Sequence, residues 1–159
     1  MLKPLGHDAL IMTEIRFYHL TMRALDSALP EICARALSAG HRILVRASSE
    51  TEVERLTNHL WSYSPTSFLP HGSKKDGHAE QQPVWLTAGN DNPNNANVMI
   101  ATAGAVPESI EGFTLFCDLF DGRDETQLAA ARQRWKTYKA SDHTLTYWQQ
   151  TEAGWEKKA

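Results

Sequence analysis

Long apolar runs are missing from this sequence. None approaches the roughly 18 residues that a helix needs to cross a bilayer. The first dozen residues, MLKPLGHDALIM, also lack the charged, apolar and small-residue zones of a signal peptide. These absences argue against membrane-spanning and exported proteins, so we expect a cytoplasmic protein without a membrane partner.

Cysteine and net charge are also scarce. Cys33 and Cys117 are the only cysteines, and each lies in a largely apolar segment, which favours buried thiols over a disulfide or a metal site. The formal net charge is −3, so the chain as a whole has no field that would draw it onto nucleic acid. Any cationic binding site must therefore be local.

The motifs that hold phosphates, metals or nucleophiles are absent as well. Segment 21–30, TMRALDSALP, follows the first expected strand without a glycine, and neither GxxxxGK[ST] nor GxGxxG occurs anywhere, so a nucleotide has no backbone cradle. The histidines and cysteines show no HxxxH, HExxH or CxxC spacing, which argues against a metal site. GxSxG is missing too. We expect no cofactor, no metal and no intrinsic catalysis.

The composition that remains is that of an ordinary globular chain. Of the 159 residues, 42% are apolar and 22% are charged, and a chain of this length buries enough surface for one core. The globular pattern starts after Met12. We expect residues 1–11 to be a disordered extension, residues 12–150 to form a single α/β domain and residues 151–159 to be a charged tail.

Strand and helix patterns alternate in the first half of the chain. Segment 15–20, IRFYHL, is rich in β-formers, and a helix-periodic apolar stripe follows it up to Gly40. Segment 42–47, RILVRA, is typical of a buried strand, and Ser49 with Glu52 forms a capping box that opens a second helix. This order favours a parallel sheet covered by helices.

The second half predicts three more strands, a long helix and a final edge strand or extended arm, at 83–88, 98–102, 113–120, 124–139 and 143–150. The linker GNDNPNNAN consists of turn residues, so we expect a mobile surface loop there. The predicted fold class is α/β, a Rossmann-like three-layer sandwich with a mostly parallel central sheet covered by helices and without a nucleotide-binding glycine loop.

The long helix carries an unusual distribution of charge. Segment 128–139, LAAARQRWKTYK, has no acidic residue. On a helical wheel its apolar stripe contains Leu128, Ala131, Trp135 and Tyr138, bordered by Arg132, Lys136 and Lys139 on one side and Arg134 on the other. A core stripe with snorkelling cations explains much of this pattern. A groove for a peptide with an apolar anchor and a carboxylate explains it equally well.

Segment 60–72, LWSYSPTSFLPHG, places aromatic residues in a stretch built from loop formers. One interpretation is core packing, in which Trp61 completes the preceding helix and Phe68 and Leu69 turn into the core. The other is a partner interface, where exposed aromatic residues contribute most of the binding energy.

Acidic residues cluster around the end of the last core strand, at Asp118, Asp121, Asp124 and Glu125. Sites of α/β proteins often lie at such strand ends. This cluster supports an alternative hypothesis, an enzyme acting on a small nucleotide or using a divalent metal at Asp118–Asp124. The simpler interpretation is that Asp124 and Glu125 are the acidic residues that a helix N-terminus favours.

The order and spacing of several short segments resemble one known family over residues 14–148. They are FYHL (17–20), HRILVRA (41–47), LW…SFLPH (60–71), DLF (118–120) and ARQRWKTYK (131–139). The chain thereby resembles the chi subunit of bacterial DNA polymerase III holoenzyme, an accessory protein of the clamp loader. The resemblance implies a Rossmann-like fold that acts as a non-catalytic adaptor.

The resemblance also implies a site for the acidic C-terminal tail of single-stranded DNA-binding protein, which ends in Pro-Phe. By position, Arg132 meets the acidic groups, Trp135 forms an aromatic wall, and Lys136 lies alongside. Leu128 stands where the family pattern has a lysine, so that end of the pocket is less basic, and Arg134 or Lys139 is expected to compensate.

A second surface implied by the resemblance binds the psi subunit, or a psi-like partner, of the clamp loader. An aromatic pair of that family matches Trp61 and Phe68, and the interface includes the neighbouring Leu69, Pro70 and His71. A repair helicase competes for this face in some members. The resemblance implies that the protein is a monomer by itself and reaches DNA only through its partners.

Overall fold

The structure is a computed structural model and describes residues 13–22, 25–64, 69–102 and 104–159. The element order alternates strands with helices, as the sequence pattern predicts. The strands are β1 (Glu14–Leu20), β2 (Ile43–Arg46), β3 (Val84–Thr87), β4 (Val98–Ala101), β5 (Leu115–Asp121), β6 (Thr144–Thr151) and β7 (Gly154–Lys157). The helices are α2 (Leu25–Ser38), α3 (Glu50–Ser62) and α4 (Glu125–Lys139), with a 3₁₀ turn at Ala79–Gln81.

All the strands belong to one sheet of order β3-β2-β4-β5-β1-β6-β7. Every neighbouring pair is parallel except β6 and β7, which are antiparallel. Alternate side chains of the strands feed two separate apolar clusters, one on each face. The predicted α/β fold, a mostly parallel sheet covered on both faces, is confirmed.

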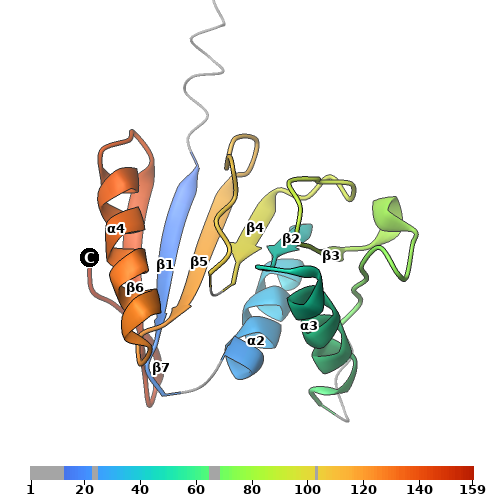
Figure 1. Ribbon diagram of the computed structural model, residues 1–159, viewed down its shortest axis with the longest axis horizontal. Helices are drawn as coiled ribbons and strands as arrows, with labels where there is room; N and C mark the ends of the chain where they lie inside the picture. The colour runs from blue at the N-terminus through green and yellow to red at the C-terminus, as the bar shows by residue number, and fades with distance from the viewer. Residues whose placement is uncertain (1–12, 23–24, 65–68, 103) are drawn as a thin grey trace, which may run out of the picture.

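Different elements cover the two faces of the sheet (Figure 1). Leu29 and Cys33 of α2 and Val53 and Leu56 of α3 pack into the first cluster. On the opposite face, α4 lies along β1 and β6, and Ala131 joins the second cluster. The two surfaces that the sequence singles out therefore lie on opposite sides of the sheet.

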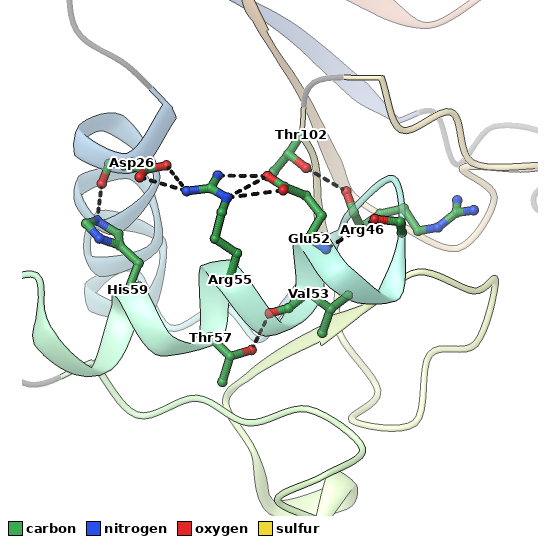
Figure 2. Close-up of polar contacts among 9 residues, drawn as sticks. Asp26, Arg46, Glu52, Val53, Arg55, Thr57, His59 and Thr102 are labelled. Atoms are coloured by element: carbon green, nitrogen blue, oxygen red, sulfur yellow. Dashed lines mark hydrogen bonds and ion pairs between the residues drawn. The ribbon is translucent and has the colours of Figure 1, made fainter.

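A network of ion pairs joins α2 to α3 (Figure 2). Arg55 of α3 lies between two acids and donates to Asp26 of α2 at 2.8 Å and to Glu52 at 2.7 Å. His59 Nε2 lies 2.6 Å from the carbonyl oxygen of Asp26. The predicted cap is present as well, since Ser49 Oγ accepts from the backbone N–H of Glu52 at 3.1 Å. The charges of Asp26, Glu52 and Arg55 are thus paired within the protein.

The prediction that segment 143–150 is an edge strand or arm is wrong, because β6 pairs with β1 on one side and β7 on the other. Residues 154–157, expected within a charged tail, form β7. Gly154 has φ +130°, which a side-chain-bearing residue rarely adopts, and so permits the reversal. Trp155 then packs edge-on against Tyr18, with 4.9 Å between ring centroids.

The linker after β3 is held more tightly than the expected surface loop. Asn94 is buried, and its side-chain amide donates to the carbonyl oxygens of Ile43 and Gln82, each at 3.0 Å. Asn92 and Ala96 close a local turn through two further hydrogen bonds. Asn94 therefore ties the linker to the start of β2 and to the segment just before β3.

Cys33 and Cys117 are buried free thiols, as their apolar neighbours predict. Burial raises the pKa of both, that of Cys117 to about 12, so neither is a reactive thiolate at neutral pH. In the described parts of the chain, no helix combines the length and apolarity that a bilayer crossing requires.

Candidate functional site

Helix α4 begins at a strong local cap. The Asp124 carboxylate accepts from the backbone N–H groups of Thr126 at 2.9 Å and Gln127 at 3.2 Å. Gln127 in turn accepts from the N–H of Asp121 through its side-chain oxygen, which ties the helix to the end of β5. The cap fixes where α4 starts.

The apolar stripe of α4 is only partly core. Ala131 is fully buried, while Leu128, Trp135 and Tyr138 are half-buried against the second cluster. Trp135 and Tyr138 meet Phe17 of β1 edge-on, at centroid distances of 5.4 Å and 6.2 Å. The stripe therefore packs on the sheet and still presents aromatic surface to solvent.

A shallow hollow of about 390 Å³ opens beside the exposed edge of Trp135. Tyr147 of β6 meets Trp135 edge-on at 5.5 Å, and Lys139 Nζ lies 5.6 Å from the centroid of the Trp135 ring. The lining residues are Arg132, Trp135, Lys136, Tyr147 and Ala159. The hollow thus combines an aromatic floor with a cationic rim.

The cations of this rim are unpaired within the described residues. Arg132, Lys136 and Lys139 are all exposed, and none of them has a salt bridge to an acid in the described ranges. Of the residues that the structure describes, no acidic side chain lines the hollow. An unpaired cationic rim over an aromatic surface favours a ligand that carries both negative charge and an apolar group.

Arg134 does not belong to this rim, so of the two residues expected to compensate for Leu128, Lys139 is the one placed beside Trp135. Its guanidinium donates to both carboxylate oxygens of Asp118 on β5, at 2.6 Å and 2.9 Å. The pair is largely shielded, with 16% of the Arg134 side chain and 3% of the Asp118 side chain exposed. Arg134 therefore neutralises an acid beneath α4.

The sequence did not indicate the residues that hold the floor of the hollow. The Tyr147 hydroxyl and His19 Nδ1 lie 2.7 Å apart, and the His19 ring stacks on Phe120. Burial lowers the pKa of His19, and the charge of Arg132 lowers it further. A Cβ at Gly122 would collide with this imidazole, so glycine leaves it room. The only signal in the sequence was the alternation of segment 143–150.

The second predicted surface lies at the end of α3. Trp61 is 51% exposed, and its ring rests on His71 with 4.4 Å between centroids. His71 and Leu69 are buried and Pro70 is half-buried, so these residues support the surface from below. Phe68, the other half of the predicted aromatic pair, lies outside the described residues.

His71 connects this surface to the core. Its Nδ1 lies 2.6 Å from the carbonyl oxygen of Leu69, and its Nε2 lies 3.0 Å from that of Thr57. A second hollow of about 180 Å³ lies beside Trp61, between α3 and residues 73–76. The two lysines at its rim pair with acids of α3, Lys74 with Glu50 at 3.5 Å and Lys75 with Glu54 at 3.1 Å.

The acidic residues near the end of β5 do not converge on one point. Asp118 binds Arg134, Asp121 binds Arg123 at 2.9 Å, and Asp124 caps α4. The hydrogen bond from Arg123 is the main cause of a lowered pKa at Asp121. Within the described residues, no group of three or more His, Cys, Asp or Glu side chains is placed to hold a metal ion. Each acid thus has a local structural role.

Known proteins provide an independent indication of the family. Residues 12–146 match the family described as DNA polymerase III chi subunit, HolC. The DNA polymerase III subunit chi of Escherichia coli (strain K12) is 24% identical over 125 residues, which cover 78% of this chain and 84% of that protein.

A probable DNA polymerase III subunit chi of Rickettsia prowazekii (strain Madrid E) is 29% identical over 89 residues, which cover 56% of this chain. That match spans about half of the Rickettsia protein, 54% of its length. The family match itself extends over most of the seven-stranded sheet, from β1 into β6. The chain therefore belongs to the DNA polymerase III chi subunit family.

Proposed function

We propose that this protein is a non-catalytic adaptor in DNA replication, which links the clamp loader of DNA polymerase III to single-stranded DNA-binding protein. In this proposal the hollow at α4 binds the acidic C-terminal tail of single-stranded DNA-binding protein, and the Trp61 surface binds a psi-like subunit. The observation that carries the proposal is the pair of exposed cations, Arg132 and Lys136, beside the aromatic floor of Trp135 and Tyr147.

The tail and the hollow are complementary in chemistry. A tail ending in Pro-Phe brings an aromatic ring, a terminal carboxylate and further acidic groups. The ring fits against the Trp135 edge, and Arg132 and Lys136 stand within the same hollow to bind the carboxylates. Leu128 is half-buried in the stripe and adds apolar surface at the end where a cation is missing. Lys139 lies over Trp135 and extends the positive rim.

A titration tests the tail site. A labelled acidic peptide ending in Pro-Phe is expected to bind the wild type, and Arg132→Glu is expected to weaken binding by at least about tenfold, since it removes a charge-assisted contact and adds repulsion. Affinity should also fall with added salt, because the rim is exposed. Fluorescence anisotropy measures both effects.

Arg35→Glu is a matched control for this titration. Arg35 is an exposed arginine of α2, on the opposite face of the sheet from the hollow. The substitution makes the same change in net charge, so a general electrostatic effect would weaken peptide binding equally in both variants. Equal affinities of wild type and Arg132→Glu would contradict the tail site.

The psi-like interface is tested at Trp61. Trp61→Ala removes a large exposed aromatic residue and is expected to abolish co-purification of the clamp-loader subunits, with the peptide titration unchanged. Val106→Ala is the control, because Val106 is an apolar residue with 57% exposure and lies in the loop after β4, where its carbonyl oxygen accepts from Arg46. Retained clamp-loader subunits with Trp61→Ala would contradict this assignment, as would their loss with Val106→Ala.

The alternative of an enzyme with a metal at Asp118–Asp124 gains no support from the side-chain arrangement, since Asp118 binds Arg134 and Asp124 caps the helix. This alternative predicts that nucleotides or divalent ions stabilise the protein by about 2.7 kcal/mol at 100 times their Kd. A thermal-shift screen distinguishes it from the adaptor proposal, which predicts no such shift.

A further inference from the structure

Helix α4 is weakly fixed by apolar contacts. Ala131 is its one fully buried residue, and the other members of the stripe are half-buried aromatic or aliphatic side chains. Edge-to-face ring contacts such as that between Trp135 and Phe17 tolerate small shifts of either ring. Apolar packing therefore holds α4 on the sheet without fixing its rotation about its own axis.

The contact between Arg134 and Asp118 restrains the rotation of α4 about its axis, which apolar packing leaves free. The guanidinium binds both carboxylate oxygens, at 2.6 Å and 2.9 Å, in the fork geometry that fixes orientation as well as distance. Asp118 is almost completely buried in the rigid central strand β5. The fork thus joins a side chain of α4 to a fixed point of the sheet.

The position of Arg134 on the helix connects this constraint to the hollow. Arg132 and Lys136 are each two residues from Arg134, which corresponds to about 200° around an α-helix. They therefore lie on the flank of α4 opposite Arg134, with the Trp135 stripe between the two flanks. A rotation of the helix that lowers one flank toward the sheet raises the other.

We infer that Asp118 and Arg134 form a positioning pair that sets the rotation of α4 and thereby the placement of Arg132 and Lys136 over Tyr147. The inference rests on the proposed tail site for its functional consequence, but its structural content is independent of that site. Arg134 touches no part of the hollow, so it acts through the helix and not through the ligand.

The test uses a double variant that removes both charges together. Asp118→Asn with Arg134→Gln leaves no unpaired buried charge, so the protein is expected to remain folded. Two-dimensional NMR then measures the cross-peaks between the Trp135 indole and the rings of Tyr147 and Phe17, which contact it in the wild type. We expect these cross-peaks to change in the double variant, and affinity for the acidic peptide to fall by about tenfold.

Arg134→Lys separates geometry from charge. This variant keeps the positive charge but cannot form the planar fork, so it should shift the Trp135 cross-peaks in the same direction and also weaken the peptide. Arg35→Gln is the control, because it removes an exposed cation from α2 and should change neither measurement.

If the double variant keeps the wild-type cross-peaks, the inference is overturned, whatever its affinity for the acidic peptide. Changed cross-peaks with wild-type affinity would overturn its functional part. If the wild type itself fails to bind the peptide, the proposed tail site is refuted, and the cross-peaks still decide whether the pair positions α4.

Discussion

The α3 and α4 surfaces handle charge in opposite ways. Around α3, the cations Arg55, Lys74 and Lys75 each pair with an acid of α2 or α3. Along the hollow of α4, Arg132 and Lys136 have no acidic partner within the described ranges. The difference shows that positive charge is available to an outside ligand at α4 and is satisfied internally at α3.

The tryptophans of the two surfaces also differ, in how far each is exposed. Trp135 is half-buried among rings of β1 and β6, whereas Trp61 is 51% exposed on top of buried His71. The α4 surface therefore suits a short charged peptide that needs a shallow apolar wall. The α3 surface suits a larger apolar partner, for which an exposed tryptophan is a typical anchor.

His71→Ala is expected to cause the largest loss of stability and to disrupt the α3 surface without changing the α4 surface. The change leaves the carbonyl groups of Leu69 and Thr57 without the imidazole and removes the support beneath Trp61. We expect a loss of about 2–4 kcal/mol in the free energy of unfolding. Urea denaturation measures the loss.

The peptide titration is the control for His71→Ala. Because the hollow at α4 lies on the opposite face of the sheet, affinity for the acidic peptide should be unchanged under conditions where the variant is folded. An unchanged unfolding midpoint would show that His71 does not support this surface.

Gly122→Ala is expected to disrupt the floor of the hollow at α4 and to leave the α3 surface intact. The new methyl group would collide with the His19 ring, so the ring must move and its contact with the Tyr147 hydroxyl is lost. We expect a destabilisation of about 1–3 kcal/mol, the usual range for overpacking. Binding of the acidic peptide should weaken, while clamp-loader subunits continue to co-purify through Trp61. Wild-type peptide affinity would show that His19 does not hold the floor.

The two helix caps allow a direct comparison of stability. Asp124 accepts from two backbone N–H groups of α4 and places a negative charge at the helix N-terminus, whereas Ser49 accepts from one N–H of α3. Asp124→Ala should therefore cost about 1–2 kcal/mol and Ser49→Ala about 0.5–1 kcal/mol. Thermal unfolding of both variants measures the difference, and a larger effect at Ser49 would contradict it.

Local patterns predicted most of the fold. Apolar runs located β1, β2, β4 and β5. The capping box at Ser49 and the acidic residues Asp124 and Glu125 located the starts of two helices, because these signals depend on neighbours in the sequence. Strand β7 was not predicted, because its sequence GWEK has one apolar residue, Trp155. The burial of Trp155 depends on its contact with Tyr18, which is far away in the chain. Pairing of this kind has no local signal.

The candidate site was predictable to the same extent. The spacing of Arg132, Trp135 and Lys136 follows from helical periodicity, and the structure brings them together in one hollow. Tyr147 and His19 meet across 128 residues and were not predicted. Asp118 did give a signal, since a carboxylate within the apolar strand FTLFCDLF requires a buried partner. The sequence did not reveal which cation that partner is.

The pairs Arg55–Asp26 and Arg134–Asp118 give the smallest expected effect, opposite contributions to the slope of stability against pH. Hydrogen bonds from Arg55 lower the pKa of Asp26, so its contribution is present above about pH 4 and is lost as the pH falls through the folded-state value. Burial raises the pKa of Asp118 more than Arg134 lowers it, so stability falls as the pH rises through its folded-state value.

Asp26→Asn should therefore flatten the rise of stability with pH in the acid range, and Asp118→Asn should steepen it. The Asp26 effect should be only a few tenths of a kcal/mol, since 37% of that side chain is exposed and the pair is screened by solvent. Urea denaturation of both variants from pH 3 to pH 7 measures the slopes. If both substitutions changed the slope in the same direction, burial would not distinguish the two pairs, and the contrast between an exposed α3 network and a buried pair under α4 would fail.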